Sequence, residues 1–356
     1  MKKIRTMTFH HVLNYGAVLQ AYALVKFLND EGHDAKVLNY LPSYFLFQTY
    51  RPCKGIKKTA DKLKKIKHFY DFRKQHLPIT KEKYFSYNQL KNVDGVDAFI
   101  CGSDQIWNKN LTKGKVDKSF LLEFSDVNSK RISFAASAGS SRISNDLSLG
   151  NNSFEKFDAL GVREDTLQKD LIEMTNNKYV EVVLDPSLIV NDYSSVSRFD
   201  LVPEGEFIVT YVVGSNDTLE YFDQSIKELK QHTKMKVIHL GAKSISSADE
   251  NILNLGPQDW VAFLSKAKFV VTNSFHGTAF SVNFKKQFIF VPNLNENLNS
   301  RQLTLLKSLD IVERKMNDIT EMKGLCETEI DYNIVTPKLD LLVEKSKEFL
   351  RSALNG

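Results

Sequence analysis

Cysteine is scarce in this sequence, and long apolar runs are missing. The three cysteines, Cys53, Cys101 and Cys326, lie far apart, without a CxxC pair or a Cys/His ligand spacing. Their placement argues against a disulfide framework and a structural zinc site. No apolar stretch approaches the roughly 20 residues that a membrane-spanning helix needs, and the first residues lack the apolar segment of a signal peptide. We therefore expect a cytoplasmic protein without a structural metal.

Repeats of solenoid period and low-complexity tracts are also absent, and neither sign of charge is in large excess. The 356 residues carry a net charge of +5, which suits an anionic substrate or a membrane surface but does not by itself indicate nucleic acid. Hydrophobic residues make up 42% of the chain and charged residues 26%, as is usual for soluble globular proteins. The length favours two domains.

Short apolar runs alternate with segments of helical spacing along the whole chain. A strand at Lys3 to Phe9 is followed by a helix over AVLQAYALVKFLNDEG and by a second strand, DAKVLNY. A polar linker from Asn191 to Glu206 separates a first series of such units from a second. This order predicts an α/β fold with two doubly wound parallel sheets. We place the domains at residues 1–195 and 196–335.

The stretch KFVVTNSFHGTAFSVNFKK, residues 268–286, carries the strongest functional signal. It reads as an apolar strand, a polar loop from Thr272 to Gly277, and a helix. Ligands bind where the strands of an open parallel sheet end, and the amides that open the next helix favour an anion. His276 can exchange a proton near neutral pH, and Gly277 permits a tight turn or a close backbone approach. The alternative is a histidine that only holds the turn by hydrogen bonds.

Small and polar residues also follow three strands of the first domain. Asn14 to Gly16 lie at the start of the first helix, where the same anion-site argument applies and a capped helix without a ligand is the alternative. The strand DAFIC runs into Ser103 and Asp104, which we interpret as a second binding loop. The run ISFAASAGS, residues 132–140, repeats the pattern of an apolar strand followed by small residues.

The segment ALGVREDT, residues 159–166, takes another strand into a charged turn. Arg163 at this position is suited to clamping a carboxylate or phosphate with its fork of donors. It is equally suited to pairing with Glu164 or Asp165.

A strongly basic helix is predicted near residues 54–76, within the first domain. Its sequence from 54 to 74, KGIKKTADKLKKIKHFYDFRK, places Leu63, Ile66 and Tyr70 at helical spacing. Such a helix either rests on an anionic membrane surface or, more often, packs its apolar edge on its own domain. Peripheral contact with the inner face of the membrane is therefore the second of two interpretations.

Six motifs, in chain order NYGAVLQAYAL, CGSDQIW, SFAASAG, VREDT, LDPSL and TNSFHGTAFS, together resemble the polysaccharide pyruvyl transferase family from about Asn14 to Arg314. The resemblance implies a glycosyltransferase-B-like architecture: two Rossmann-like domains that face each other across a cleft, with the C-terminal helix, residues 336–356, packing back on the first domain. It implies transfer of the pyruvyl group of phosphoenolpyruvate to two hydroxyls of a sugar, which forms a cyclic ketal and releases phosphate. The acceptor would be a sugar or lipid-linked saccharide of a capsule, exopolysaccharide or cell-wall polymer.

The same resemblance assigns Arg163 to the phosphoenolpyruvate anion and matches His276 to the histidine of the family's HG motif. We expect His276 to transfer a proton or to hydrogen-bond the departing phosphate. Asp104 and Glu164 are candidates to orient or deprotonate the acceptor hydroxyl. Further candidates for substrate binding are Ser274, Gly277, Thr278, Arg301 and Ser103, and, on the acceptor side, Asn14, Gly16 and Gln20. None of this chemistry requires a metal or another cofactor.

The chain departs from the family pattern at Ser274. The pattern resembles Arg-Leu-His-Gly, and Ser274 stands where the arginine is expected. Arg301 or Lys243 could supply the missing cation. Two other functions stay open: a glycosyltransferase that uses a nucleotide sugar, and a non-catalytic sugar- or anion-binding protein in which His276 is structural.

Overall fold

The computed structural model describes residues 1–139, 143, 153–175 and 179–356. Ser140, the last residue of the predicted small-residue run, lies outside this part. The chain divides into two compact units, which we call unit 1 and unit 2. Unit 1 comprises Met1–Pro52, Tyr70–Val190 and Leu341–Gly356, and unit 2 comprises Cys53–Phe69 and Asn191–Asp340.

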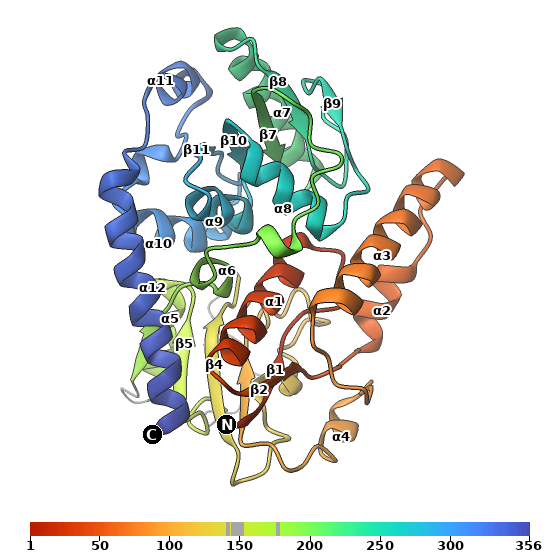
Figure 1. Ribbon diagram of the computed structural model, residues 1–356, viewed down its shortest axis with the longest axis vertical. Coiled ribbons are helices and arrows are strands. Elements are labelled where there is room, and N and C mark those ends of the chain that lie inside the picture. The colour runs from red at the N-terminus through yellow and green to blue at the C-terminus, as the bar shows by residue number, and fades with distance from the viewer. Residues whose placement is uncertain (140–142, 144–152, 176–178) are drawn as a thin grey trace. The chain divides into compact units, whose positions relative to one another are not determined.

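Unit 1 contains a parallel six-stranded sheet in the order β2-β1-β3-β4-β5-β6 (Figure 1). The strands are β1 (Lys3–Met7), β2 (Asp34–Val37), β3 (Ala98–Cys101), β4 (Lys130–Ala136), β5 (Ala159–Val162) and β6 (Val180–Val182). The chain order reverses between β1 and β3, which is the topological switch point of this sheet.

The helices of unit 1 are α1 (Tyr15–Asp30), α2 (Ser43–Tyr50), α4 (Tyr87–Leu90), α5 (Asp165–Met174) and α6 (Pro186–Ile189). Nearly all of α1 is buried, which explains why its sequence is apolar on several faces. The buried side chain of Trp107 donates from Nε1 to the carbonyl oxygen of Phe120 at 3.0 Å and lies in the main core of this unit.

Unit 2 contains a parallel five-stranded sheet in the order β11-β10-β7-β8-β9. Its strands are β7 (Phe207–Tyr211), β8 (Lys236–His239), β9 (Glu250–Asn251), β10 (Phe269–Thr272) and β11 (Gln287–Phe290). Its helices are α7 (Asn216–His232), α8 (Pro257–Lys266), α9 (Phe275–Asn283), α10 (Ser300–Ser308) and α11 (Met322–Glu327). The switch point of this sheet lies between β7 and β10. The two sheets confirm the predicted α/β fold class.

Two long helices, α3 (Ile56–His76) and α12 (Tyr332–Asn355), each contribute residues to both units. The second half of α12 packs on the sheet of unit 1, where the ring of Phe349 lies 6.2 Å from that of Phe134 and Ser346 Oγ accepts a hydrogen bond from the Leu184 amide at 2.9 Å. The predicted division at 195/196 and the division between the units, at Val190 and Asn191, differ by five residues.

Short 3₁₀ helices complete the described chain at Lys118–Leu121, Ser194–Val196, Glu296–Asn299, Val312–Arg314 and Ile319–Glu321. Among the described residues, no helix combines the length and the apolar character that crossing a bilayer requires.

Candidate active site

The strands of unit 1 end in polar side chains that hydrogen-bond to one another. These side chains are Thr8 after β1, Ser103 after β3, Ser137 after β4, Arg163 and Glu164 after β5, and Asp185 after β6. All of them are at least nine-tenths buried. The carboxyl ends of parallel strands share one edge of the sheet, so the predicted residues Ser103, Arg163 and Glu164 are brought to that edge.

Arg163 forms a buried ion pair at this edge. Its Nη2 lies 2.8 Å from Asp185 Oδ2, and the two side chains are 1% and 0% exposed. Arg163 Nη2 also donates to Ser103 Oγ, and Ser103 Oγ lies 2.6 Å from Asp185 Oδ2. Asp185 further accepts from the Ser187 amide and hydroxyl at 2.9 and 2.6 Å. The sequence predicted Arg163 as a ligand for a substrate anion, and Asp185 was not among the predicted site residues although it lies in the LDPSL motif.

Gln20 ties helix α1 to the loop after β3. Its Nε2 donates to Thr8 Oγ1 at 2.9 Å and to the Ala17 carbonyl at 2.7 Å, and its Oε1 accepts from the Ser103 amide at 3.1 Å. These bonds use both ends of a fully buried amide. Gln20 therefore positions Ser103 at the β1/β3 switch point.

The other predicted residues at the start of α1 lie where a helix begins. Asn14 is the N-cap, and its Oδ1 accepts from the Ala17 amide at 3.2 Å. Gly16 lies in the first turn. An N-cap that satisfies one of the first amides is an ordinary helix start, which leaves the acceptor role of these residues as a prediction.

Glu164 and Asp104, the two predicted carboxylates, each bind donors of nearby loops. Glu164 Oε1 accepts from Ser137 Oγ at 2.8 Å and from the Ala138 amide at 3.1 Å. Asp104 has a positive φ of 75° and accepts from the Gln105 amide at 2.8 Å. Both carboxylates therefore shape the strand-end loops of unit 1.

In unit 2, the stretch after β10 differs from its prediction in one respect. The helix starts at Phe275, not after Gly277, so His276 and Gly277 lie in the first turn of α9. Ser274 is the N-cap, its Oγ facing the Gly277 amide at 3.5 Å, and Thr278 Oγ1 donates to the Ser274 carbonyl at 3.1 Å. The helix is able to start this early because the Ser274 hydroxyl supplies an acceptor for one of the first helix amides, that of Gly277.

Glycine is needed at position 277 because the backbone there lies very close to the side chain of Thr272. A Cβ atom at this position would lie 2.9 Å from both Cβ and Cγ2 of Thr272, and nearer still to its Oγ1. That hydroxyl is fixed, because it donates to the Tyr211 carbonyl at 2.7 Å and accepts from the Ser274 amide at 3.1 Å. Of the two roles considered for Gly277, a tight turn and a close backbone approach, the structure shows the close approach, which brings the first turn of α9 against the end of β10.

Asn273 joins the two strands that flank the switch point of unit 2. Its Oδ1 accepts from the Val213 amide at 2.8 Å, and its Nδ2 donates to the Val213 carbonyl at 2.7 Å and to Asn293 Oδ1 at 3.1 Å. The loop after β7 is thereby pinned beside the start of α9. An asparagine directly after a buried strand was the available sequence signal, but the residue was not among the predicted site residues.

Of the two cations considered as replacements for the missing arginine, Arg301 precedes a residue that contacts this strand end. It lies in the first turn of α10, and the next residue, Gln302, donates to the Asn273 carbonyl at 2.9 Å. Lys243 follows β8 and donates to Asn216 Oδ1 at 2.7 Å, at the start of α7. In the described ranges no group of three His, Cys, Asp or Glu side chains is arranged to hold a metal ion.

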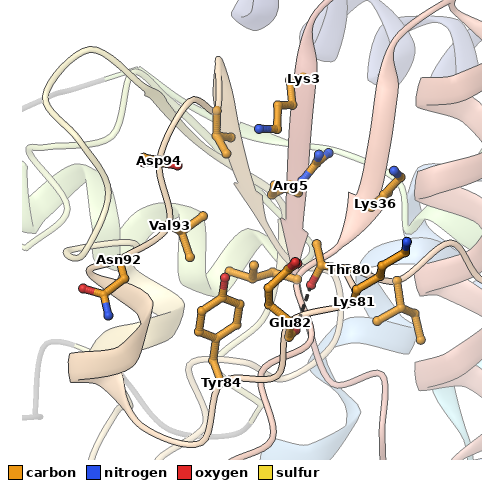
Figure 2. Close-up of a pocket in the computed structure, with 13 residues that line it drawn as sticks. Lys3, Arg5, Lys36, Thr80, Lys81, Glu82, Tyr84, Asn92, Val93 and Asp94 are labelled. Atoms are coloured by element: carbon orange, nitrogen blue, oxygen red, sulfur yellow. Dashed lines mark hydrogen bonds between the residues drawn. The ribbon is translucent and has the colours of Figure 1, made fainter.

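A separate hollow of about 520 Å³ lies in unit 1 and is lined by none of the predicted site residues. Figure 2 shows its cations, Lys3, Arg5, Lys36 and Lys81, and its two carboxylates, Glu82 and Asp94. Lys3 and Arg5 stand at the beginning of β1, away from the strand end that carries Thr8. Arg5 is already paired with Asp34 at 3.1 Å, and this contact lowers the pKa of the Asp34 carboxyl. The hollow is thus distinct from the strand-end cluster.

Solved structures similar to this chain show its fold. S. aureus MnaA in a co-structure with UDP matches with a TM-score of 0.56 and 12% identity, over 100% of this chain and 97% of that chain. The UDP-GlcNAc 2-epimerase of Methanocaldococcus jannaschii, in complex with UDP-GlcNAc and UDP, matches with a TM-score of 0.54 and 11% identity over 91% of each chain. The UDP-GlcNAc 2-epimerase of Neisseria meningitidis, bound to UDP-GlcNAc, matches with a TM-score of 0.52 and 9% identity over 99% of each chain. The shared fold is the glycosyltransferase-B-like class with two Rossmann-like units.

No curated protein matches the chain. The family model for polysaccharide pyruvyl transferase matches residues 14–295, which include the start of α9 and every strand-end residue of unit 1 named above except Thr8. This chain therefore belongs to the polysaccharide pyruvyl transferase family, and it is a transferase.

Proposed function

We propose that this transferase moves the pyruvyl group of phosphoenolpyruvate onto a saccharide and forms a cyclic ketal. The family match carries the proposal. The start of α9 supports it, because a helix N-terminus at the end of a parallel strand favours an anion, and phosphoenolpyruvate carries both a phosphate and a carboxylate.

The reaction needs an acid, a base and partners for two anionic groups. A proton adds to the methylene carbon of the donor and makes it a methyl group, while positive charge develops at the central carbon. One sugar hydroxyl adds to that carbon and loses its proton. Phosphate then leaves, and the second hydroxyl closes the ring and loses its proton. One of the two hydroxyl protons balances the proton gained by the methyl group, and the other leaves with phosphate.

His276 is our candidate for the proton transfer, since it lies in the turn where the donor phosphate would bind. Ser274, Gly277 and Thr278 would form the donor side with the first amides of α9, and Arg301 would supply the cation that the family pattern places at position 274. Arg163 stays a candidate for the donor anion, although it is ion-paired with Asp185 in the structure.

On the acceptor side we propose Asn14, Gly16, Gln20 and Ser103, with Asp104 or Glu164 orienting the attacking hydroxyl. The acceptor would be a sugar of a capsule, exopolysaccharide or cell-wall polymer, or its lipid-linked precursor. We place the reaction in the cytoplasm, where phosphoenolpyruvate is available, and propose that no other cofactor takes part.

The first test is thermal unfolding of the whole chain with phosphoenolpyruvate and, separately, with UDP-GlcNAc. A ligand at a hundred times its dissociation constant adds about 2.7 kcal/mol to the stability of the native state. We expect a rise in Tm with phosphoenolpyruvate that is lost in His276→Ala or Arg301→Ala, each compared with its own ligand-free Tm. Release of phosphate from phosphoenolpyruvate in the presence of acceptor saccharides then measures turnover.

A nucleotide-sugar transferase is the second candidate, because similar solved structures hold UDP or UDP-GlcNAc. A rise in Tm with UDP-GlcNAc alone would favour it and would refute the phosphoenolpyruvate proposal. Binding of phosphoenolpyruvate that persists without phosphate release across all acceptors, in wild type and His276→Ala alike, would favour a non-catalytic anion-binding protein.

A further inference from the structure

The positive charge of the chain is concentrated in one short segment. Residues Cys53–Phe69 contain seven lysines and one aspartate, a net charge of +6. The remaining residues contain 41 Lys and Arg against 42 Asp and Glu, a net charge of −1. Most of this segment is the first part of helix α3, drawn in orange in Figure 1. The excess of cations therefore belongs to one helix and not to the surface as a whole.

The same helix exposes large apolar side chains on one face. Ile56 is 92% exposed and Leu63 is 60% exposed. The two residues are seven apart, which is about two helical turns, so both project from the same side. Tyr70, seven residues further along, is 55% exposed. The interpretation that Leu63 and Tyr70 pack on their own domain was wrong for both residues, because only Ile66 of that trio is half-buried.

The opposite side of α3 is held by unit 2. Asp61 Oδ1 accepts from Asn254 Nδ2 at 3.0 Å, and the side chain of His68 lies against Gly256. Phe69 is fully buried. These contacts fix which side of the helix faces outward, so the exposed apolar side chains are a stable feature of the folded chain.

Exposed lysines flank the apolar residues on that outward side. By helix geometry, Lys67 lies between Leu63 and Tyr70, on the same side as the apolar residues. The exposed Lys57 and Lys64 lie roughly a third of a turn further around the helix, at the edge of this face toward Asp61 and His68. A polyanion such as nucleic acid would engage the lysines but would gain nothing from Ile56 and Leu63. A bilayer with anionic headgroups engages both, because apolar side chains enter the interface while lysines meet the negative surface.

We propose that the outward face of α3, formed by Ile56, Leu63, Lys57, Lys64 and Lys67, docks on an anionic lipid bilayer. From Ile56 to Lys67 this face is about 17 Å long and lies parallel to the membrane plane. Docking would hold the transferase on the surface that carries a lipid-linked acceptor. The docking itself does not depend on pyruvyl transfer.

The test is flotation of the whole protein with vesicles of phosphatidylcholine alone and of phosphatidylcholine mixed with phosphatidylglycerol. We expect binding to the mixed vesicles only, with loss at high salt because the Debye length shrinks to about 3 Å at 1 M. The triple variant Lys57→Gln, Lys64→Gln, Lys67→Gln should weaken binding at least tenfold, since each lysine near an anionic surface contributes a factor of about five. Leu63→Gln should weaken it about tenfold through lost apolar burial.

A matched control removes the same charge elsewhere. Lys227, Lys234 and Lys307 are exposed and lie outside α3, and their triple change to Gln should leave binding within about twofold of wild type. The substituted side chains are exposed, so Tm should stay unchanged in both triple variants. The proposal would be overturned if both triple variants lost vesicle binding equally, or if the protein bound neutral vesicles as well as anionic ones. It would also be overturned if the protein bound no vesicles, or if Leu63→Gln left binding unchanged. None of these outcomes bears on whether phosphoenolpyruvate binds.

Discussion

Both units place polar side chains where parallel strands end, but they use them differently. In unit 1 the charged side chains are bound by partners within the same sheet edge: Arg163 pairs with Asp185, and Glu164 accepts from the Ser137 hydroxyl and the Ala138 amide. In unit 2 the polar side chains around β10 act on the backbone, since Asn273 binds Val213. Unit 1 thus builds a closed electrostatic network, and unit 2 builds a fixed helix start.

This difference indicates in which unit the effect of a substitution on ligand binding can be separated from its effect on stability. A buried ion pair is strongly coupled to stability, because removing one partner leaves an uncompensated charge. A helix start offers backbone amides to an anion without a buried charge of its own. We therefore expect substitutions in the unit 1 network to act first on stability, and substitutions at the start of α9 to act first on binding and turnover.

The largest effect should come from Asp185→Asn. It leaves the Arg163 guanidinium without its carboxylate at a site that is 0–1% exposed, which should lower the free energy of unfolding by about 3–5 kcal/mol. Urea unfolding followed by fluorescence measures this. The double variant Arg163→Met with Asp185→Leu removes both charges and should recover most of the loss. A loss below about 1 kcal/mol for Asp185→Asn would show that the pair does not hold unit 1 together.

Gly277→Ala tests the close packing in unit 2 and should come second. The new methyl group would meet the fixed side chain of Thr272, and overpacking of this kind typically lowers stability by about 1–3 kcal/mol. Gly324 in α11 is the matched control, because nothing lies within 4 Å of its Cβ position. Gly324→Ala should be neutral or slightly stabilising. Equal effects of the two substitutions would contradict the tight approach of α9 to β10.

Much of unit 2 could be predicted from its sequence. The apolar run before Thr272 and the polar residues after it identify a strand end without any tertiary information. The helix start was misjudged because Gly277 suggested a turn, whereas Ser274 three residues earlier is a good N-cap. Local propensity cannot decide whether Gly277 forms a turn or lies within the helix. Glycine is needed at this position because Thr272 on β10 leaves no room for a Cβ atom.

The network of unit 1 could not be predicted in the same way. Arg163 and Asp185 are 22 residues apart, and the sequence offered Glu164 and Asp165 as nearer partners. Their pairing follows from the adjacency of β5 and β6, which brings the two strand ends together. Gln20 likewise reaches Ser103 only because β1 and β3 are neighbours in the sheet. Pairings across a sheet depend on strand order, which a single sequence does not specify.

A fall in pH tests the stability of both units in the same way, because each unit contains a buried histidine. Burial lowers the pKa of His10 in unit 1 and of His239 in unit 2 to about 4. Both folded values lie below the ordinary value of 6.5, so the stability that these groups contribute is present above pH 6.5 and is lost as pH falls toward 4. Between pH 7 and pH 5, each histidine should lower the free energy of unfolding by about 2 kcal/mol.

Urea unfolding of wild type, His10→Asn and His239→Asn at pH 7 and pH 5 measures this loss. Each variant should show a shallower pH dependence than wild type, because one buried neutral histidine is gone. Unit 1 should respond more to acid, since burial and the neighbouring His10 also lower the pKa of His11 to about 2. An unchanged slope in either variant would contradict the assignment for that histidine.

The smallest change in stability, and the one that best separates the two kinds of strand end, is expected for Ser274→Ala. Removing the N-cap of α9 should lower stability by about 1 kcal/mol. Ser215→Ala is the matched control, because Ser215 caps α7 in the same way, with its Oγ 3.3 Å from the Thr218 amide. The two variants should lose similar stability, but only Ser274→Ala should reduce phosphoenolpyruvate binding and phosphate release. Equal loss of turnover in both variants would show that the donor anion does not bind specifically at the start of α9. Intact turnover in Ser274→Ala would show that the donor binds away from α9.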